Sequence, residues 1–181
     1  MKKFILTFIT TICLSFVGFC QNTITFKGIP IDGSIYDFST SLEKLGYENI
    51  EDEDAVVFYG EFNGRKSFIN PQTVNNKVWR VFVLDEKSTD RNSIVNRFNE
   101  LFGQFQNNPK YVHSGGSFIP DGEDIERNII INNFRYDATF SLSDTSINGL
   151  VWFAIHMKTI NEFYITMFYE NWDNKADGSD L

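Results

Sequence analysis

The sequence predicts an α+β domain, in which an antiparallel sheet of six to eight strands carries two helices on one of its faces. Two stretches have apolar residues at helical spacing and recognisable capping residues at their ends. Several other stretches alternate in polarity or are rich in β-branched and aromatic residues, which is typical of strands. Asn63-Gly64 is the strongest hairpin signal in the chain and predicts that its neighbouring strands run antiparallel.

The first helix is predicted within residues 23–47, where a short strand and a turn precede it. Ser34 is expected to be the N-cap with Asp37 as the partner of a capping box, and Gly46 to end the helix in the left-handed conformation. One face of the helix is apolar and has to be buried; its residues are Ile35, Phe38, Leu42 and Leu45.

This opening stretch carries a resemblance to known proteins. The order F-x-G-I-P-I-D-G at residues 26–33, with the helix that follows, resembles the opening of a group of small secreted proteins typical of gut Bacteroidetes, which have no assigned function. The later positions that carry the resemblance are Phe38, Leu42, Gly46, Tyr47, Gly60–Gly64 and Phe168–Asn171. The resemblance implies secretion and a compact α+β domain, and it implies no chemistry.

An acidic connector and three antiparallel strands are expected after the first helix. The third strand, KVWRVFVL, is apolar on nearly both faces and should be central in the sheet. Asn70-Pro71 is expected to end the second strand. The connector is Glu48–Asp54, and the strands are Ala55–Phe62, Arg65–Ile69 and Lys77–Leu84.

A second helix is predicted over Asp90–Asn107, and Pro109 marks its end. Its buried stripe is Ile94, Phe98, Leu101, Phe102 and Phe105. A long loop and three closing strands follow, the first of which starts at Ile129 or at Phe134. These segments are the loop Tyr111–Glu126 and strands ending at Leu142, spanning Gly149–Lys158 and spanning Glu162–Glu170.

Residues 21–171 are therefore expected to form a single domain, followed by a flexible polar tail at residues 172–181. A helix followed by strands occurs twice in succession, which leaves open an arrangement of two successive helix-plus-strands units. Such an arrangement would resemble the β-lactamase inhibitory proteins, whose concave sheet face grips a partner. This likeness concerns architecture alone and carries no function by itself.

The composition limits the classes of function. The chain has 181 residues, enough for one domain with a substantial core, and 42% of them are hydrophobic. Its aromatic content of 16%, with 19 Phe, is that of a packed chain and not of a disordered one. The formal net charge of -8 argues against a surface that follows nucleic-acid phosphates, so no nucleic-acid partner is expected.

Residues 1–20 are predicted to be a secretory signal peptide. Lys2-Lys3 precede an apolar run at residues 4–19, which is too short to span a membrane comfortably. Removal of this segment takes away two lysines and brings the charge near -10 (-8 minus two). The chain is therefore expected to be exported, periplasmic or extracellular, with no integral membrane segment after cleavage.

The cleavage site is expected between Cys20 and Gln21, because Gly18 and Cys20 occupy the small-residue positions. The alternative is a lipoprotein with a lipid on Cys20. Phe19 argues against it, because a lipoprotein signal has a small residue immediately before the cysteine. Cleavage after Cys20 leaves a mature chain without cysteine, and hence without disulfides or thiolate metal sites.

Few residues are candidates for catalysis. The two histidines, His113 and His156, lie on different elements, and neither has an acidic pair at metal-ligand spacing. One loop crowds four carboxylates without the alternating ligands and the glycine of a calcium loop. These carboxylates are Asp121, Glu123, Asp124 and Glu126. We therefore expect no metal site and no cofactor.

The last two strands carry the most informative pattern. Alternation assigns one face to the core, and its residues are Val151, Phe153, Ile155, Met157, Phe163, Ile165, Met167 and Tyr169. The opposite face carries Trp152, His156, Tyr164 and Phe168, interleaved with Thr166 and Glu170. A contiguous aromatic patch on a sheet marks a contact surface. The alternative is a second layer that covers these rings, formed by the loop at residues 111–126.

Three readings of the function follow from these patterns. The first is a non-enzymatic binding module that uses Trp152, His156, Tyr164 and Phe168 to bind a protein or a glycan. The second is a small hydrolase that uses the loop carboxylates with His113 as the base. A structural protein of the cell envelope is a third reading, which the sequence does not separate from the first.

The signal-peptide interpretation is tested by the mass of the exported chain. Because Gly18 and Cys20 fit the cleavage rule, we expect the intact mass of a chain that begins at Gln21. A diacylglyceryl group on Cys20 would instead show that the protein is a lipoprotein.

Overall fold

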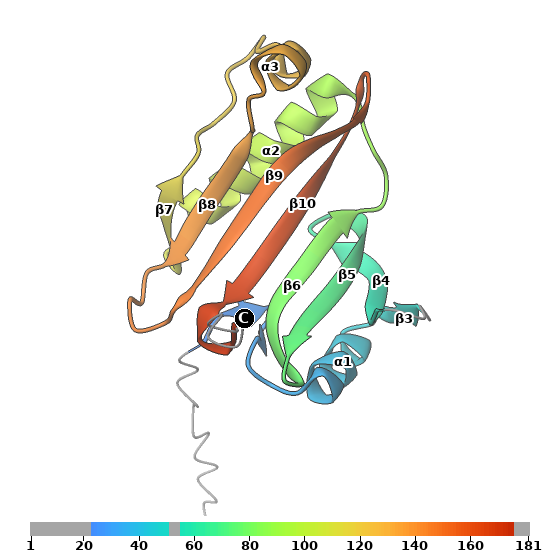
Figure 1. The fold of residues 1–181 in the computed structure, drawn as a ribbon, viewed down its shortest axis with the longest axis vertical. Coiled ribbons are helices and arrows are strands. Elements are labelled where there is room, and N and C mark those ends of the chain that lie inside the picture. Colours follow the sequence, from blue (N-terminus) through green and yellow to red (C-terminus); the bar gives the residue numbers. More distant parts are fainter. Residues whose placement is uncertain (1–22, 51–54, 176–181) are drawn as a thin grey trace, which may run out of the picture.

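An eight-stranded antiparallel sheet forms the body of the protein in the computed structural model, which describes residues 23–50 and 55–175 (Figure 1). The predicted signal peptide therefore lies outside the described residues. The strands of this sheet are β3 (Glu48–Ile50), β4 (Val57–Phe62), β5 (Arg65–Val74), β6 (Lys77–Asp85), β7 (Tyr111–Gly115), β8 (Asp137–Leu142), β9 (Gly149–Thr159) and β10 (Glu162–Asn171). The remaining elements are β1 (Thr25–Phe26), β2 (Ile29–Pro30), α1 (Ile35–Lys44), α2 (Arg91–Gln106), α3 (Ile125–Asn132) and the 3₁₀ turn η1 (Trp172–Asn174). The predicted fold class is confirmed, with one helix more than expected.

Two four-stranded meanders make up the sheet, whose strand order is β3-β4-β5-β6-β10-β9-β8-β7. A helix precedes each meander, α1 the first and α2 the second. The last strands of the meanders, β6 and β10, pair antiparallel in the centre with Phe82 opposite Phe168. The chain is thus built from two successive helix-plus-strands units that share one sheet. As predicted, β6 is a central strand.

The N-cap and the C-terminal glycine predicted for α1 are present, but the Asp37 carboxylate bonds the hydroxyl of Ser34 and not its amide, as a capping box would require. The hydroxyl of Ser34 accepts a hydrogen bond from the amide of Asp37 at 3.2 Å and donates one to the Asp37 carboxylate at 2.7 Å. Gly46 has φ +86°, and the amide of Tyr47 reaches back to the carbonyl of Leu42 at 3.1 Å. Of the predicted apolar stripe, Leu45 is exposed, because it is the C-cap and has already turned away from the core.

The second helix follows its prediction closely. Asp90 is the N-cap of α2 and accepts the amide hydrogen of Ser93 at 3.0 Å. All five apolar residues of the predicted stripe are buried, together with Arg97. The helix packs on β9 and β10, which pass in front of it in Figure 1. The opposite face of the sheet, called here the outer face, is turned to the viewer.

Three segments differ from the sequence prediction. Residues 48–50 were expected to be connector and form the edge strand β3, paired with β4. The expected long loop contains the edge strand β7, paired with β8. Residues 125–132 were placed before or within a strand and form α3, capped by Asp124. The isoleucine-rich run favours a strand by propensity, but the Asp124 cap satisfies the first turn of a helix.

The strand β5 also continues through Asn70-Pro71, where a break was expected. Pro71 lies opposite Val81 of β6 and beyond Ile69, at which the pairing of β5 with β4 stops. On that side β5 is locally an edge, a position where proline is tolerated. A register shift follows between Gln72 and Thr73.

The Asn63-Gly64 hairpin gives a stability test. Both residues have positive φ, +49° and +76°, as a type I′ turn requires. A Cβ added at Gly64 would meet no atom within 4 Å, so we expect the cost of Gly64→Val to come from the backbone. We expect this change to lower the free energy of unfolding by about 1 kcal/mol or more in denaturant titration.

Gly33→Val is the matched control, because Gly33 has no positive φ and its nearest neighbouring atom to an added Cβ is 4.0 Å away. It should change stability much less than Gly64→Val. Equal effects of the two substitutions would show that left-handed backbone at Gly64 does not limit stability.

Candidate functional site

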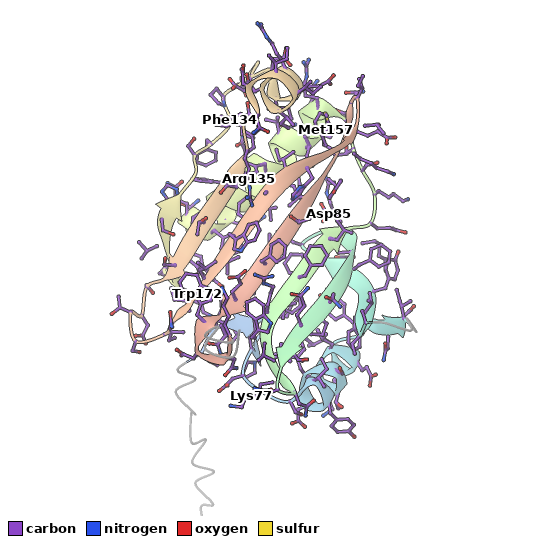
Figure 2. All side chains as sticks on the ribbon, viewed as in Figure 1. Lys77, Asp85, Phe134, Arg135, Met157 and Trp172 are labelled. Atoms are coloured by element: carbon purple, nitrogen blue, oxygen red, sulfur yellow. The ribbon has the colours of Figure 1, made fainter. Side chains whose placement is uncertain are left out.

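The outer face carries the four residues predicted as a binding surface. Trp152, His156, Tyr164 and Phe168 are all half-buried on β9 and β10, whereas the alternating set between them is buried in the core, with Met157 only partly so. The predicted assignment of faces is therefore observed for these strands. Figure 2 shows the side chains that cover this face, with Arg135 beside β8 and β9 and Trp172 at the lower end of the sheet.

The four rings form two stacked pairs. Trp152 and Phe168 lie opposite each other in the register, with ring centroids 4.1 Å apart and planes 15° apart. His156 and Tyr164 are also opposite, at 5.3 Å and 18°. Thr166 lies between the pairs, and its hydroxyl is 2.8 Å from Nε2 of His156. The two rings of each pair therefore lie on neighbouring strands and stack against each other.

The aromatic surface continues across the sheet centre onto the first unit, which the sequence analysis missed. Phe82 of β6 packs on Phe168 with centroids 5.0 Å apart. Farther out, Phe68 of β5 and Tyr59 of β4 form another pair at 5.5 Å. The signal was present in the sequence, because KVWRVFVL is apolar on both faces and so places aromatic rings outward as well as inward.

Glu170 organises the lower end of this surface. Glu170 is only 4% exposed, and its carboxylate accepts hydrogen bonds from the indole N–H groups of Trp152 at 3.0 Å and Trp172 at 2.8 Å. Arg80 pairs with it at 2.7 Å. Burial alone raises the pKa of Glu170, but the indole hydrogen bonds and the charge of Arg80 outweigh it, so the pKa is lowered. The carboxylate is therefore ionised at neutral pH.

Trp79 joins this cluster through a bulge. The register of β6 against β5 passes from Val78 to Arg80, so Trp79 has no opposite residue. A bulge turns a side chain out of strict alternation. The guanidinium of Arg80 lies 4.1 Å from the centre of the Trp79 ring and 5.2 Å from that of Phe168.

Arg135 affects two of the four residues of this surface, Trp152 and His156. Its guanidinium lies 5.2 Å from the centre of the Trp152 ring. Burial lowers the pKa of His156, and the positive charge of Arg135 lowers it further. His156 is therefore neutral at physiological pH, and its ring acts as a flat, uncharged member of the patch.

A depression of about 290 Å³ opens beside Tyr164. Phe82, Leu84 and Thr166 lie around it, and its charged lining residues are Lys158, Asp85 and Glu86. Among the described residues, no salt bridge involves Lys158. The depression can accept one large apolar side chain next to an unpaired ammonium group.

The loop that was considered as a cover for these rings packs elsewhere. Phe118 lies against Phe102 of α2 with centroids 4.5 Å apart. Ile119 is tied to Asn99 of α2 by two hydrogen bonds of 2.9 Å. The loop therefore covers the helix and not the outer face. The alternative of a second layer made by this loop is wrong.

The second predicted site, around His113, has a different arrangement. Nε2 of His113 lies 3.0 and 2.9 Å from the carbonyl oxygens of Gly115 and Gly116, so it serves as a donor to the backbone. The ring packs on Phe102 and Phe140. The cavity of about 390 Å³ next to the loop is lined by Glu123 and Asp137 and not by His113.

The carboxylates of that loop have structural partners. Glu123 accepts hydrogen bonds from Asn128 at 2.6 Å and from the hydroxyl of Tyr136 at 2.9 Å. Asp124 caps α3 and lies 3.6 Å from Arg91. Within residues 23–50 and 55–175, no group of three metal-ligating side chains is found. The geometry thus gives the hydrolase hypothesis little support.

Comparison of the chain with protein-family models, with curated proteins and with solved structures finds no match in any of the three. The resemblance to secreted Bacteroidetes proteins therefore stays an expectation. In the described part of the chain, the helices are too short or too polar to cross a lipid bilayer.

Adjacent residues of β9 test which face is covered. Phe153 is fully buried against Phe98, so Phe153→Ala should cost about 3–5 kcal/mol. Trp152→Ala removes a half-buried ring and one hydrogen bond to Glu170, so we expect a smaller loss of about 1–2 kcal/mol. The measurement is the free energy of unfolding of both variants. Equal losses would mean that the outer face is covered in solution.

Proposed function

We propose that this protein is an exported, non-enzymatic binding module that holds a polypeptide segment on its outer face. The observation that supports it most is the continuous row of half-buried rings across the sheet centre, from Phe82 through Phe168 to Trp152. The loop before β8 reaches this row through Arg135, whose guanidinium lies 5.2 Å from the centre of the Trp152 ring. Export rests on the predicted signal peptide alone.

A polypeptide fits this surface better than a glycan. Sugars stack on a free ring face, but Trp152 has Phe168 on one side and the guanidinium of Arg135 near its ring. Phe168 likewise lies between Trp152 and Phe82. The rings offer edges and small depressions, into which apolar side chains insert. Trp, Tyr and Arg are also the residues that dominate binding energy in protein interfaces.

Charge indicates what else the segment carries. The chain as a whole is acidic, yet five of the six cation–π contacts among the described residues lie on this face. Arg135 and Lys158 stand at its rim, with Lys158 beside the depression. The favoured partner is therefore a segment that presents a large apolar side chain flanked by Asp or Glu.

A displayed library of random peptides tests this proposal on the purified chain. We expect enriched peptides to combine a large apolar residue with neighbouring carboxylates. Tyr164→Ala and Lys158→Glu should each weaken their binding about tenfold or more, because one removes a wall of the depression and the other reverses the charge beside it. Binding should also weaken as salt is added.

Tyr36→Ala is the control variant, because Tyr36 is 75% exposed on α1 and takes no part in the outer face. It should leave binding unchanged. Peptides that bind the Tyr164 and Lys158 variants as well as the native chain would contradict the proposal. Binding to arrayed glycans in place of peptides would replace it with a carbohydrate-binding role.

A further inference from the structure

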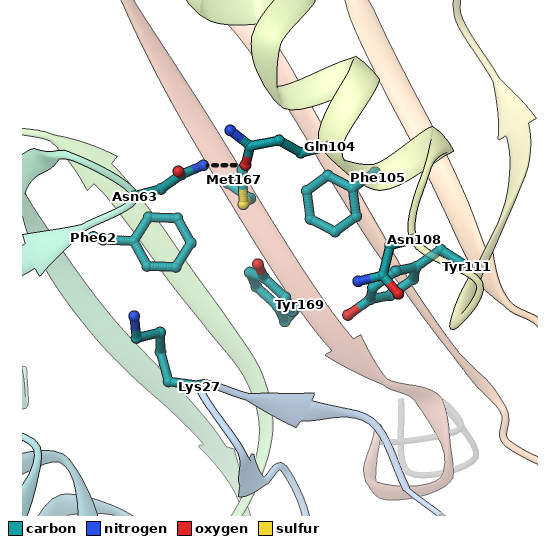
Figure 3. Close-up of a pocket in the computed structure, with 9 residues that line it drawn as sticks. All are labelled: Lys27, Phe62, Asn63, Gln104, Phe105, Asn108, Tyr111, Met167 and Tyr169. Atoms are coloured by element: carbon teal, nitrogen blue, oxygen red, sulfur yellow. Dashed lines mark hydrogen bonds between the residues drawn. The ribbon is translucent and has the colours of Figure 1, made fainter.

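A second cleft lies on the helix-bearing face, between the two units (Figure 3). Its volume is about 270 Å³. Met167 and Tyr169 of β10 form its floor, and Phe62 and Phe105 stand on its two sides. The first unit ends here at the Asn63-Gly64 turn, and the second begins with α2. The cleft therefore arises because the two units join at β6 and β10, and α2 covers only part of this junction.

The hydroxyl of Tyr169 points into this cleft (Figure 3). Tyr169 is 7% exposed, and no hydrogen bond from its hydroxyl to another described residue is found. Burial raises the pKa of Tyr169, with a further contribution from Tyr111 and Tyr47, so the phenol stays protonated. Burial likewise raises the pKa of Tyr111 to about 12. Two neutral phenols thus offer hydrogen bonds to anything that enters.

One cation stands at the mouth of the cleft. Lys27 lies in the tight turn between β1 and β2, and its ammonium group points towards the cleft. No Asp or Glu belongs to the lining, although the chain contains 24 of them. Among the described residues, no salt bridge involves Lys27. The cleft is therefore locally positive in an acidic protein.

The backbone of Lys27 is unusual. It has φ +51°, and the other described residues with positive φ are all Asn or Gly. Asn is better suited to this conformation than Lys, so the turn is less stable than it could be. Backbone strain at a residue such as Lys27, whose charged side chain faces a cleft, is typical of a binding site.

The remaining polar groups are carboxamides. Asn63 donates to Gln104 at 2.8 Å across the top of the cleft, which leaves further donors and acceptors of both groups available. Asn108 lines the opposite side, next to Tyr111 (Figure 3). Carboxamides and phenolic hydroxyls together match a small ligand with several hydroxyl groups.

We propose that this cleft binds a hexuronic acid, a sugar ring that carries a carboxylate, either free or at the end of an oligosaccharide. The carboxylate would pair with Lys27, and the ring hydroxyls with the carboxamides and the hydroxyl of Tyr169. A phosphate would need more than one cation or a row of backbone amides. The single cation favours a single carboxylate. This site is independent of the outer face.

The test is a titration of the ¹⁵N-labelled full mature chain with galacturonate and glucuronate, following the side-chain amide signals of Asn63, Gln104 and Asn108. Galactose, glucose and acetate are the comparison ligands. We expect at least one uronate to shift these signals and to bind about tenfold more tightly than its neutral sugar, because a charge-assisted hydrogen bond is lost in the latter. A trigalacturonate that binds more tightly than the monomer would identify a chain end as the ligand.

Two variants separate binding from folding. Lys27→Asn should keep or raise the melting temperature, since Asn tolerates positive φ, and should reduce uronate affinity about tenfold while leaving the affinity for the neutral sugar unchanged. Tyr169→Phe keeps the ring and should leave stability unchanged, yet weaken uronate and neutral sugar alike by about fivefold.

Lys87→Asn is the control for charge, because Lys87 is exposed and lies outside this cleft. The proposal is overturned if millimolar uronate leaves the three carboxamide signals in place. It is also overturned if acetate binds as tightly as uronate, or if Lys27→Asn and Lys87→Asn have the same effect on affinity.

Discussion

The pairing of β6 with β10 is the contact on which the rest of the structure depends. Without it the chain would consist of two four-stranded meanders, each with one more exposed strand edge. The pairing places Phe82 opposite Phe168 on one face and Val81 opposite Tyr169 on the other. Both candidate binding surfaces therefore cross the same seam. A buried ion pair lies beside this seam, since Arg97 of α2 lies 3.6 Å from Asp85 at the end of β6.

That ion pair also explains how the helix of the second unit is fixed to the first. Arg97 donates to the carbonyl oxygen of Asn63 at 2.9 Å, so α2 is tied to the hairpin turn as well as to β6. Asp85 and Arg97 are 6% and 4% exposed, and a buried pair of this kind gives specificity of arrangement more than net stability. Burial lowers the pKa of Arg97, while the charge of Asp85 raises it, with a net lowering. The position of α2 in turn sets the width of the cleft above Met167 and Tyr169.

Local signals were sufficient to predict most of the fold. Capping residues located both long helices, and the alternation on β9 and β10 separated Phe153 from Trp152 correctly. Apart from α3, which has the local cap Asp124, the errors arose where a segment gains its structure from a neighbouring strand. Residues 48–50 and 111–115 are strands because β4 and β8 offer them an edge, and nothing in their own composition requires it. Pro71 was misread because proline is tolerated only where the partner strand has ended, which depends on register.

The candidate sites show the same limit more clearly. Trp152, His156, Tyr164 and Phe168 were predictable because they lie on two consecutive strands joined by a short turn. Their extension to Phe82 required knowledge that β6 pairs with β10, strands between which α2, β7, α3, β8 and β9 lie in the sequence. The cleft could not be predicted from the sequence for the same reason, because its lining residues come from the β1–β2 turn, β4, α2, β7 and β10. The topology of the chain brings these residues together, and the pattern of residues within one helix or strand does not predict such a site.

Consecutive residues of β10 serve opposite surfaces, which links the two proposals physically. Phe168 and Glu170 face outward, and Tyr169 between them faces the cleft. Glu170 holds three donors on the outer face, and this fixes the strand in place because a buried carboxylate without them would be costly. The fixed backbone is what keeps the Tyr169 hydroxyl aimed into the cleft without a partner of its own. A substitution that removes the hydrogen bonds of Glu170 would therefore weaken binding on both faces. A substitution of Lys27 or Lys158, each at the rim of a single site, would weaken binding at that site alone. This difference separates a defect of the shared strand from the loss of either site.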